Sequence, residues 1–267
     1  MPLVVCATPI GNLEDVTLRL LAELRAAAVV LCEDTRHTRG LLERHGIDAR
    51  LVSYHEHNEA ARTAELLPRL VAGERIALVS DAGMPGVSDP GARIVRAALD
   101  AGVAVTVLPG PSAVETALVA SGLVGGRYQF VGFLPRGEKA LGALWAELRG
   151  WHWPAVAFES PQRLPATLRS LSAADPERQV AVCRELTKRF EEVVRGTAAD
   201  VAARFAEAPK GEITLVVGPA PASEPAEDDA LAAVSELVEA GVPRKRAAEI
   251  VSRLTGVARN ALYRGSL

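Results

Sequence analysis

Acidic and basic side chains follow directly after one of the apolar runs of the sequence, a position from which they could hold a polar substrate or move a proton. The segment CEDTRHTRGLL places Glu33, Asp34 and Arg36 behind the run VVLC. A helix cap at Asp34 or Thr35 with a solvated first turn would account for some of these residues. Two carboxylates followed by three bases are dense for a plain loop, and we expect a functional role here.

Two histidines in the segment SYHEHNE suggest a different chemistry. His55 and His57 flank Glu56, and alternate residues of a strand share a face, as ligands of a zinc ion would have to. No third soft ligand lies nearby in the sequence. We therefore expect no metal, and we interpret the segment as a polar strand end capped by Asn58.

The segment LVSDAGMPGVSDPGARIV (78–95) contains the strongest signal for a ligand. Its connection between strand and helix spans about ten residues, where two to six are usual, and long connections are often functional. Gly83, Gly86 and Gly91 would let the backbone approach a ligand closely. The sequence predicts a helix with Asp89 as N-cap and Pro90 at its first position. The turn PGPSA (109–113) follows, with Ser112 as the predicted N-cap of the next helix.

Three further strand ends carry polar residues. The turn TPIGN (8–12) precedes a predicted helix that opens at Leu13, and it lacks the G-x-G-x-x-G spacing of a dinucleotide site. In FESPQR, Glu159 either takes part in chemistry or only bonds the helix start at Ser160. In RELTKRFEE, Glu185 and Lys188 either position a substrate or belong to a solvated, ion-rich turn.

Composition limits the classes of protein that remain. The chain has 267 residues and a net charge of −3, which argues against a nucleic-acid binder that is basic over its whole surface. Only 4% of its residues are aromatic, which argues against binding of nucleic acid by stacking of bases on aromatic rings. Its three cysteines lie apart in apolar runs, as buried thiols of a reducing compartment do. The N-terminus lacks a basic leader, and the apolar runs fall short of the roughly 18 residues of a membrane span. We expect a cytoplasmic α/β protein.

Short apolar runs alternate with amphipathic stretches along most of the chain, which predicts a largely parallel sheet covered on both faces. The predicted strands lie at 3–8, 29–34, 50–55, 75–81 and 103–110, and then at 129–135, 154–160, 179–186 and 212–218. We place two α/β domains at 1–114 and 115–219. Residues 220–267 are predicted to form a linker (219–229) and a helical tail.

The polar blocks together resemble one family. TPIGNLED, EDTRHTRGLL, SYHEHNE, LVSDAGMPGVSDPG, LPGPSA, FVGFLPR, FESPQRL, CRELTKRFEE and GEITLVV occur in the order found in the bacterial 16S ribosomal RNA 2′-O-ribose methyltransferases for cytidine-1402, a branch of the tetrapyrrole methylase superfamily. The resemblance covers residues 3 to about 218, and VPRKRAAEIVSRLTGVARNALYR resembles the family's small C-terminal helical extension. Met84 departs from the pattern, where a small hydroxylated residue is common.

This resemblance implies two α/β domains with S-adenosylmethionine in the cleft between them, S-adenosylhomocysteine as product, and a homodimer. The implied cofactor contacts are Pro9, Asp81, Met84, Ser112, Ala113, Phe158 and Thr214. The implied partner is 16S rRNA in the small ribosomal subunit, without a membrane or a metal. The candidates for positioning the substrate or assisting proton removal are Glu33, Asp34, Arg36, Glu159, Glu185 and Lys188.

The last 26 residues carry six basic side chains against one acidic side chain, and we expect this tail to dock on RNA through phosphate contacts. Solubility alone would also explain an arginine-rich exposed helix. Two other functions stay open at this point. One is C-methylation of a tetrapyrrole precursor, and the other is a non-catalytic adaptor that binds RNA or DNA only through the tail.

Overall fold

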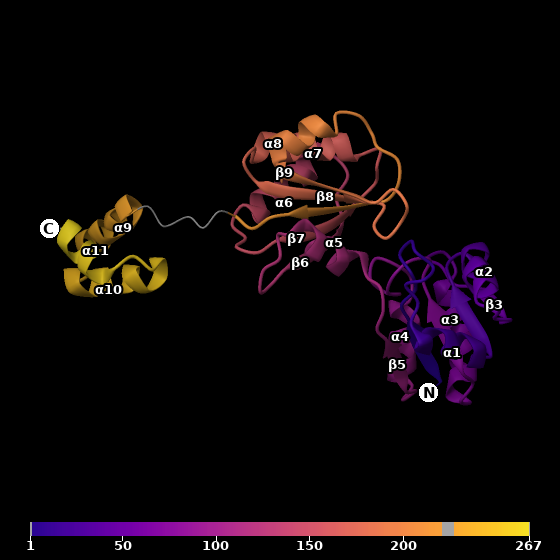
Figure 1. Ribbon diagram of the computed structural model, residues 1–267. Coiled ribbons are helices and arrows are strands. Elements are labelled where there is room, and N and C mark those ends of the chain that lie inside the picture. Colours follow the sequence, from indigo (N-terminus) through magenta and orange to yellow (C-terminus); the bar gives the residue numbers. More distant parts are fainter. Residues whose placement is uncertain (1, 221–226, 267) are drawn as a thin grey trace. The chain divides into compact units, whose positions relative to one another are not determined.

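The computed structural model describes residues 2–220 and 227–266, which form two compact units divided after Pro219. The larger unit contains two sheets of five strands each, and the smaller unit is a group of three helices (Figure 1). We call residues 3–112 the first lobe and residues 113–217, which begin with helix α5 (Ala113–Ser121), the second lobe. The division of the larger unit at residue 114, which falls within α5, stays a prediction.

The first lobe is built on a fully parallel sheet with the strand order β3-β2-β4-β1-β5. Its strands are β1 (Leu3–Cys6), β2 (Val29–Cys32), β3 (Leu51–Ser53), β4 (Ile76–Val79) and β5 (Val105–Leu108). The central strands β1, β2 and β4 are buried along their whole length, as expected for a parallel sheet covered on both faces. The parallel sheet predicted from the apolar runs is confirmed for this lobe.

Helices cover both faces of the first sheet. They are α1 (Leu18–Ala26), α2 (Thr35–Arg44), α3 (Glu59–Val71) and α4 (Ala92–Asp100). Side chains alternate between the faces: Leu3 and Val5 of β1 pack in the cluster with α3 and α4, whereas Val4 and Cys6 pack in the cluster with α1 and α2. Helix α1 begins five residues later than predicted, because Thr17 caps it by accepting a hydrogen bond from the Leu20 N–H.

The second lobe contains a mixed sheet with the order β6-β7-β10-β8-β9, so the prediction of a parallel sheet is wrong here. Its elements are α5 (Ala113–Ser121), β6 (Gln129–Phe133), α6 (Glu138–Leu148), β7 (Ala155–Glu159), α7 (Leu164–Ala174), β8 (Gln179–Arg184), β9 (Glu192–Thr197), α8 (Ala198–Arg204) and β10 (Ile213–Val217). Only β6 and β7 are parallel; β10 runs antiparallel to both β7 and β8, and β8 pairs with β9 as an antiparallel hairpin.

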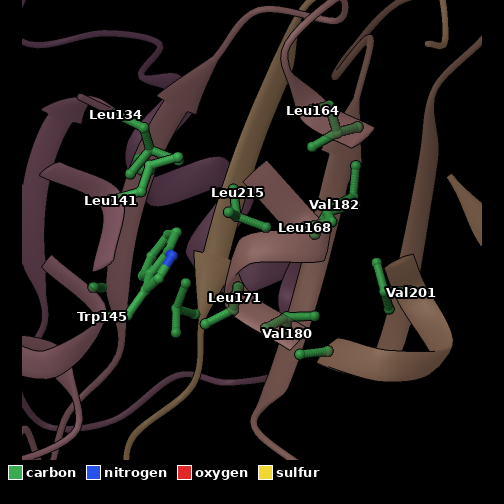
Figure 2. Packing of buried hydrophobic residues seen from close by; sticks show 14 of the residues in the cluster. Leu134, Leu141, Trp145, Leu164, Leu168, Leu171, Val180, Val182, Val201 and Leu215 are labelled. Atoms are coloured by element: carbon green, nitrogen blue, oxygen red, sulfur yellow. The ribbon is translucent and has the colours of Figure 1, made fainter. Parts of the chain in front are cut away.

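The second lobe also has a core on each face of its sheet. Figure 2 shows the larger core, where leucines of α7 meet Val180 and Val182 of β8 and Leu215 of β10. Trp145 of α6 lies in the same cluster and donates a hydrogen bond from its indole N–H to Ser170 (3.0 Å). On the other face, α5 packs on the sheet together with Ile10, which belongs to the first lobe. The two lobes therefore share an apolar cluster.

The smaller unit consists of α9 (Glu227–Glu239), α10 (Arg244–Thr255) and α11 (Arg259–Gly265) around a small core of alanine, valine and leucine side chains. Helix α10 ends at Thr255, and the left-handed backbone of its C-cap Gly256 (φ 77°) makes the turn towards α11. Of the predicted linker 219–229, residues 221–226 lie outside the described residues, and 227–229 belong to α9. Among the described helices, none combines the length and apolar character that a membrane crossing requires.

Candidate active site

A cavity of about 720 Å³ lies between the lobes, at the carboxyl ends of the parallel strands of the first sheet. Open parallel sheets commonly bind ligands at this edge, and the volume suits a small organic molecule. Its lining is largely apolar and comes from the β4–α4 connection and the turn before α5 in the first lobe, and from β6, β7, β8 and β10 in the second. The predicted cofactor residues at its wall are Asp81, Met84, Ser112, Ala113, Phe158 and Thr214.

Aromatic rings form one wall of the cavity. Phe158 of β7 meets Phe130 and Phe133 of β6 edge to face, with centroid distances of 5.0 and 5.4 Å. Phe133 keeps 62% of its surface exposed, so part of its ring is open to contact. Such a wall suits a flat, apolar part of a ligand.

The start of α5 forms a polar part of the lining. Ser112 is the N-cap of this helix, as predicted, but its hydroxyl bonds the Glu115 carboxylate instead of the helix N–H groups. Tyr128 donates a second hydrogen bond to Glu115 (2.5 Å). The first N–H groups of α5, at the cavity wall, therefore lack a side-chain cap and can receive an anionic ligand group.

Asp81 connects the ends of β4 and β2. Its carboxylate accepts a hydrogen bond from the backbone N–H of Asp34 (3.0 Å), so the predicted EDTR block and the β4–α4 connection meet. Burial, the charge of Asp81 and that of Glu56 all raise the pKa of Glu33. Glu33, Asp34 and Arg36 do not line the cavity itself.

Asp34 and Arg36 form hydrogen bonds and an ion pair with each other. Asp34 is the N-cap of α2 and accepts from the Arg36 N–H (2.8 Å), and the Arg36 guanidinium binds both of its carboxylate oxygens (3.1 and 2.7 Å). The hydrogen bonds from Arg36 hold the pKa of Asp34 well below its usual value. The Arg36 side chain is 88% exposed and could turn to a phosphate at little cost.

The loop between β8 and β9 crosses from the second lobe to the first. The Asn12 N–H donates to Thr187 Oγ1 (3.0 Å), which joins the RELTK block to the TPIGN turn. Glu185 and Thr187 both have left-handed backbones (φ 53° and 65°), a strained conformation for a β-branched residue such as threonine. Lys188 binds Glu185 (2.9 Å) and Glu212 (2.8 Å), and the bond from Lys188 lowers the pKa of Glu185.

Two other predicted residues are enclosed by the protein. Glu159 lines the cavity but has a fully buried carboxylate, which accepts from the Ser160 N–H (2.7 Å) and Thr167 (2.6 Å) and pairs with Arg163 (3.2 Å). Pro9 is buried in the TPIGN turn and is not part of the lining, whereas its neighbour Ile10 is. All three cysteines are buried and free, as expected.

Sequence reasoning missed several lining residues. Phe130, Phe133 and Tyr128 come from β6 and the residue before it, and only the three-dimensional arrangement shows that this strand borders the cavity. Asp89 was assigned to a helix cap, but α4 begins at Ala92 with Gly91 as its N-cap. The left-handed Ser88 beside it gave no sequence signal.

Solved structures show which class of protein has this fold. The crystal structure of the methyltransferase CobJ matches with a TM-score of 0.63 at 19% identity, over 82% of this chain and 94% of that one. Uroporphyrin-III C-methyl transferase from Thermus thermophilus complexed with S-adenyl homocysteine matches with a TM-score of 0.56 at 20% identity, over 81% and 96%. At these identities the likeness concerns the fold, which is the tetrapyrrole methylase fold.

Sequence comparison assigns the family. The profile of the Tetrapyrrole (Corrin/Porphyrin) Methylases matches residues 2–202, and the profile of the RsmI C-terminal HTH domain matches residues 224–265. A ribosomal RNA small subunit methyltransferase I from Mesorhizobium japonicum is 47% identical over 97% of this chain and 88% of its own length, and one from Streptococcus pyogenes is 40% identical over 96% and 91%. The chain belongs to the tetrapyrrole methylase family, in the branch of the small-subunit ribosomal RNA methyltransferases I.

Proposed function

We propose that this protein transfers the methyl group of S-adenosylmethionine to the ribose 2′-oxygen of cytidine-1402 in 16S ribosomal RNA. The observation that carries the proposal is the likeness, at 40–47% identity over nearly the whole chain, to proteins named ribosomal RNA small subunit methyltransferase I. The C-terminal match supports the same branch, because it covers the helical tail (residues 224–265), which the match over residues 2–202 does not reach.

The cavity has the chemistry that S-adenosylmethionine requires. The ligand combines a flat adenine, a ribose with two hydroxyls and an amino-acid end with a carboxylate. The ring wall of Phe130, Phe133 and Phe158 suits the adenine. The uncapped start of α5 suits the carboxylate, and Asp81 can accept from a hydroxyl. Thr214, opposite Phe158 on β10, presents a further hydroxyl at the wall.

The cofactor supplies a methyl group on a positively charged sulfur, which is already a strong donor. The protein's part is to hold the acceptor oxygen in line with that methyl group, and alignment of this kind can lower a barrier by about 7–11 kcal/mol in favourable cases. The apolar lining keeps water away from the donor. Met84, which departs from the family's pattern, contributes to this apolar wall.

We assign the outer polar groups to the RNA. Arg36 is exposed beside the cavity's rim residue Asp81 and can bind a phosphate. Lys188 and Glu185 shape the loop that crosses between the lobes. Glu159, with every oxygen engaged, holds the start of α7. Glu33 and Asp34 place two acidic side chains directly after β2.

The tail is proposed as a docking module for RNA. Lys245, Arg253, Arg259 and Arg264 are exposed on α10 and α11, so their charges are available to phosphates. The proposed substrate is the small ribosomal subunit, and its location makes the cytoplasm the proposed site of action. We also propose a homodimer, which is supported by large exposed fractions of Val107 (53%), Val119 (71%) and Val124 (56%).

Methyl transfer from labelled S-adenosylmethionine tests the proposal. Small ribosomal subunits, free 16S RNA and a tetrapyrrole precursor are offered in parallel. Label in RNA supports the proposed function, and label only in the tetrapyrrole assigns C-methylation instead. If calorimetry detects no binding of S-adenosylhomocysteine and no substrate is labelled, the protein is a non-catalytic adaptor. Light scattering of the same sample tests the homodimer.

A further inference from the structure

Removal of the 2′-hydroxyl proton requires an acceptor near the cavity, and most of the ionisable groups in the lining already have partners. Glu159 is closed off by Arg163 and Thr167. Glu212 pairs with Lys188. Cys183 is buried with its Sγ directed to the Ala117 carbonyl, and burial raises the pKa of this thiol to about 11, so it stays protonated at neutral pH.

Two more carboxylates of the lining are engaged as well. Glu115 accepts hydrogen bonds from Ser112 and Tyr128; burial opposes ionisation, but these bonds hold the pKa of Glu115 below its usual value. Asp81 accepts from the Asp34 N–H and thereby fixes the end of β2. A carboxylate that holds the scaffold in place is less free to take up a proton.

Asp89 differs from these groups. It lines the cavity, is half-buried, and forms no ion pair with any residue of the described part of the chain. The sequence predicts it to cap α4, but Gly91 is the N-cap, and the side chain is not needed for the helix. Asp89 lies on the β4–α4 connection, directly in front of the first turn of that helix.

The residue before Asp89 has an unusual backbone conformation. Ser88 precedes it with a left-handed backbone (φ 63°), which non-glycine residues seldom adopt without a reason. The Ser88 hydroxyl lies against Gly132 of β6, where an added Cβ would be 3.8 Å away, so the loop reaches the second lobe. A position at the junction of the lobes suits a group that must meet a substrate.

The surroundings of Asp89 favour proton uptake near neutral pH. Burial is the largest effect, and the charges of Glu33 at the end of β2 and Asp81 at the end of β4 add to it, while a hydrogen bond from Ser80 opposes them. Of the residues after β3, Glu56 raises the pKa of Glu33 and His55 lowers it. The pKa of Asp89 is raised to about 6, close to the value that best suits a base working at neutral pH.

We propose that Asp89 is the general base of the methyl transfer. The proposal rests on the proposed function, since it names the group that takes the proton of the ribose hydroxyl. The 2′-oxygen forms a bond to the methyl carbon, the carbon–sulfur bond breaks, and its electron pair goes to sulfur, which leaves as a neutral thioether. The hydroxyl proton passes to the Asp89 carboxylate and from there to solvent.

Asp89→Asn tests this role by removing the acceptor at nearly constant size. We expect the single-turnover rate of methyl transfer to fall by about 10²–10⁴-fold, while S-adenosylhomocysteine binds as it does to the wild type. The matched control is Asp100→Asn at the exposed end of α4, which should leave the rate unchanged. Full activity of Asp89→Asn would overturn the proposal, and so would a loss of S-adenosylhomocysteine binding, which would make Asp89 a cofactor contact.

A second measurement uses the wild-type protein and does not depend on the activity of a variant. The carboxyl carbon of Asp89, labelled with ¹³C in the wild-type protein and assigned by comparison with Asp89→Asn or by backbone connectivity, reports its titration. The pKa from this titration should equal the midpoint at which the single-turnover rate rises with pH. Different values would contradict the assignment even if Asp89→Asn failed to fold. If the wild-type protein transfers no methyl group at all, the proposed function is refuted. This result differs from the loss of activity in Asp89→Asn alone, so the two failures can be told apart.

Discussion

At the scale of single residues, the site depends on carboxylates placed at the ends of neighbouring strands. Asp81 and Glu33 follow β4 and β2, and Asp89 lies ten residues beyond the end of β4. Parallel strands end at one edge of the sheet, so these carboxylates lie close together, and none of the three forms an ion pair within the described residues. Such an arrangement costs stability, and its retention at a cavity points to function rather than folding.

Asp81 is expected to act mainly by holding the backbone. Asp81→Ala leaves the Asp34 N–H without its acceptor, a loss of about 1–3 kcal/mol, and should weaken S-adenosylhomocysteine binding by about tenfold or more. Asp81→Asn keeps an amide oxygen that can accept the same hydrogen bond, and should retain most of the affinity. Calorimetric titration compares the two. An equal loss in both variants would show that the charge, not the acceptor, is what the ligand needs.

Asp89 should also affect stability in a pH-dependent way. Its pKa is about 6 in the folded protein against about 3.9 in an unfolded chain, so the folded state loses stability as the pH rises from about 4 to about 6, and the full loss is present above pH 6. Asp89→Asn should therefore melt higher than the wild type at pH 8, and the difference should shrink as the pH falls towards 4. Thermal melts at several pH values measure it. A variant that melts lower at pH 8 would contradict a raised pKa at this position.

At the scale of elements, the β8–β9 loop acts as a clasp between the lobes. It lies on the TPIGN turn, where Gly11 leaves room for Lys188: an added Cβ would come within 2.5 Å of Lys188 Cγ and 2.9 Å of Thr187 Oγ1. Those atoms lie at the strained part of the loop and cannot move without disturbing Glu185. Close packing at Gly11 therefore holds the TPIGN turn of the first lobe against the β8–β9 loop of the second lobe.

Gly11→Ala should push this clasp away. We expect a loss of stability of about 1–3 kcal/mol, as for other overpacked positions, together with weaker S-adenosylhomocysteine binding. Gly40→Ala is the control: this residue lies in α2 with no atom within 4 Å of an added Cβ, and alanine there should stabilise by about 0.5–1 kcal/mol. Chemical denaturation compares the variants. If both behave alike, the clasp is not under steric constraint.

The sequence predicted elements better than their pairing. Continuous apolar runs gave the strands of both lobes, but the runs of the second lobe look the same although β10 lies antiparallel between β7 and β8. Strand β9 was missed because its sequence EVVRGT is polar and only half-buried at the sheet edge. The turn glycines of the β4–α4 connection correctly indicate the ligand cavity. The predicted start of α4 lies two residues too early, and it assigns Asp89 to the helix cap instead of the cavity wall. Side-chain partners depend on contacts across the fold that no local pattern contains.

At the scale of the whole molecule, charge is divided unevenly within the smaller unit, because the sequence of α9 has five acidic residues and no basic one, whereas α10 and α11 have six basic residues and one acidic one. The chain is acidic in sum, but α10 and α11 carry the basic excess on a small helical unit with its own core. A basic surface on α10 and α11 would gain affinity for RNA by releasing counterions, with little dependence on sequence. The α/β unit would then provide the selectivity.

A chain ending at Pro219 should separate these contributions. It should fold and bind S-adenosylhomocysteine like the full chain, because the larger unit has its own cores and cavity. It should lose RNA affinity, and the slope of log affinity against log salt should fall by about 0.7–0.9 for each phosphate that only the tail neutralises. Filter binding at several salt concentrations measures both. Unchanged affinity and slope would place the RNA-binding surface on the larger unit, where Arg36 is the first candidate.

Ribose methylation of one nucleotide of 16S ribosomal RNA is the function proposed for the cavity between the lobes. It is tested most directly by incubating the full chain with small ribosomal subunits from cells lacking this modification and with labelled S-adenosylmethionine, and then mapping the label by nuclease digestion and mass spectrometry. We expect one labelled nucleotide, cytidine-1402, with the methyl group on the ribose 2′-oxygen, and labelling about 10²–10⁴-fold slower when Asp89→Asn replaces the wild type. Label on a base, at another nucleotide or in no RNA at all would contradict the proposed function.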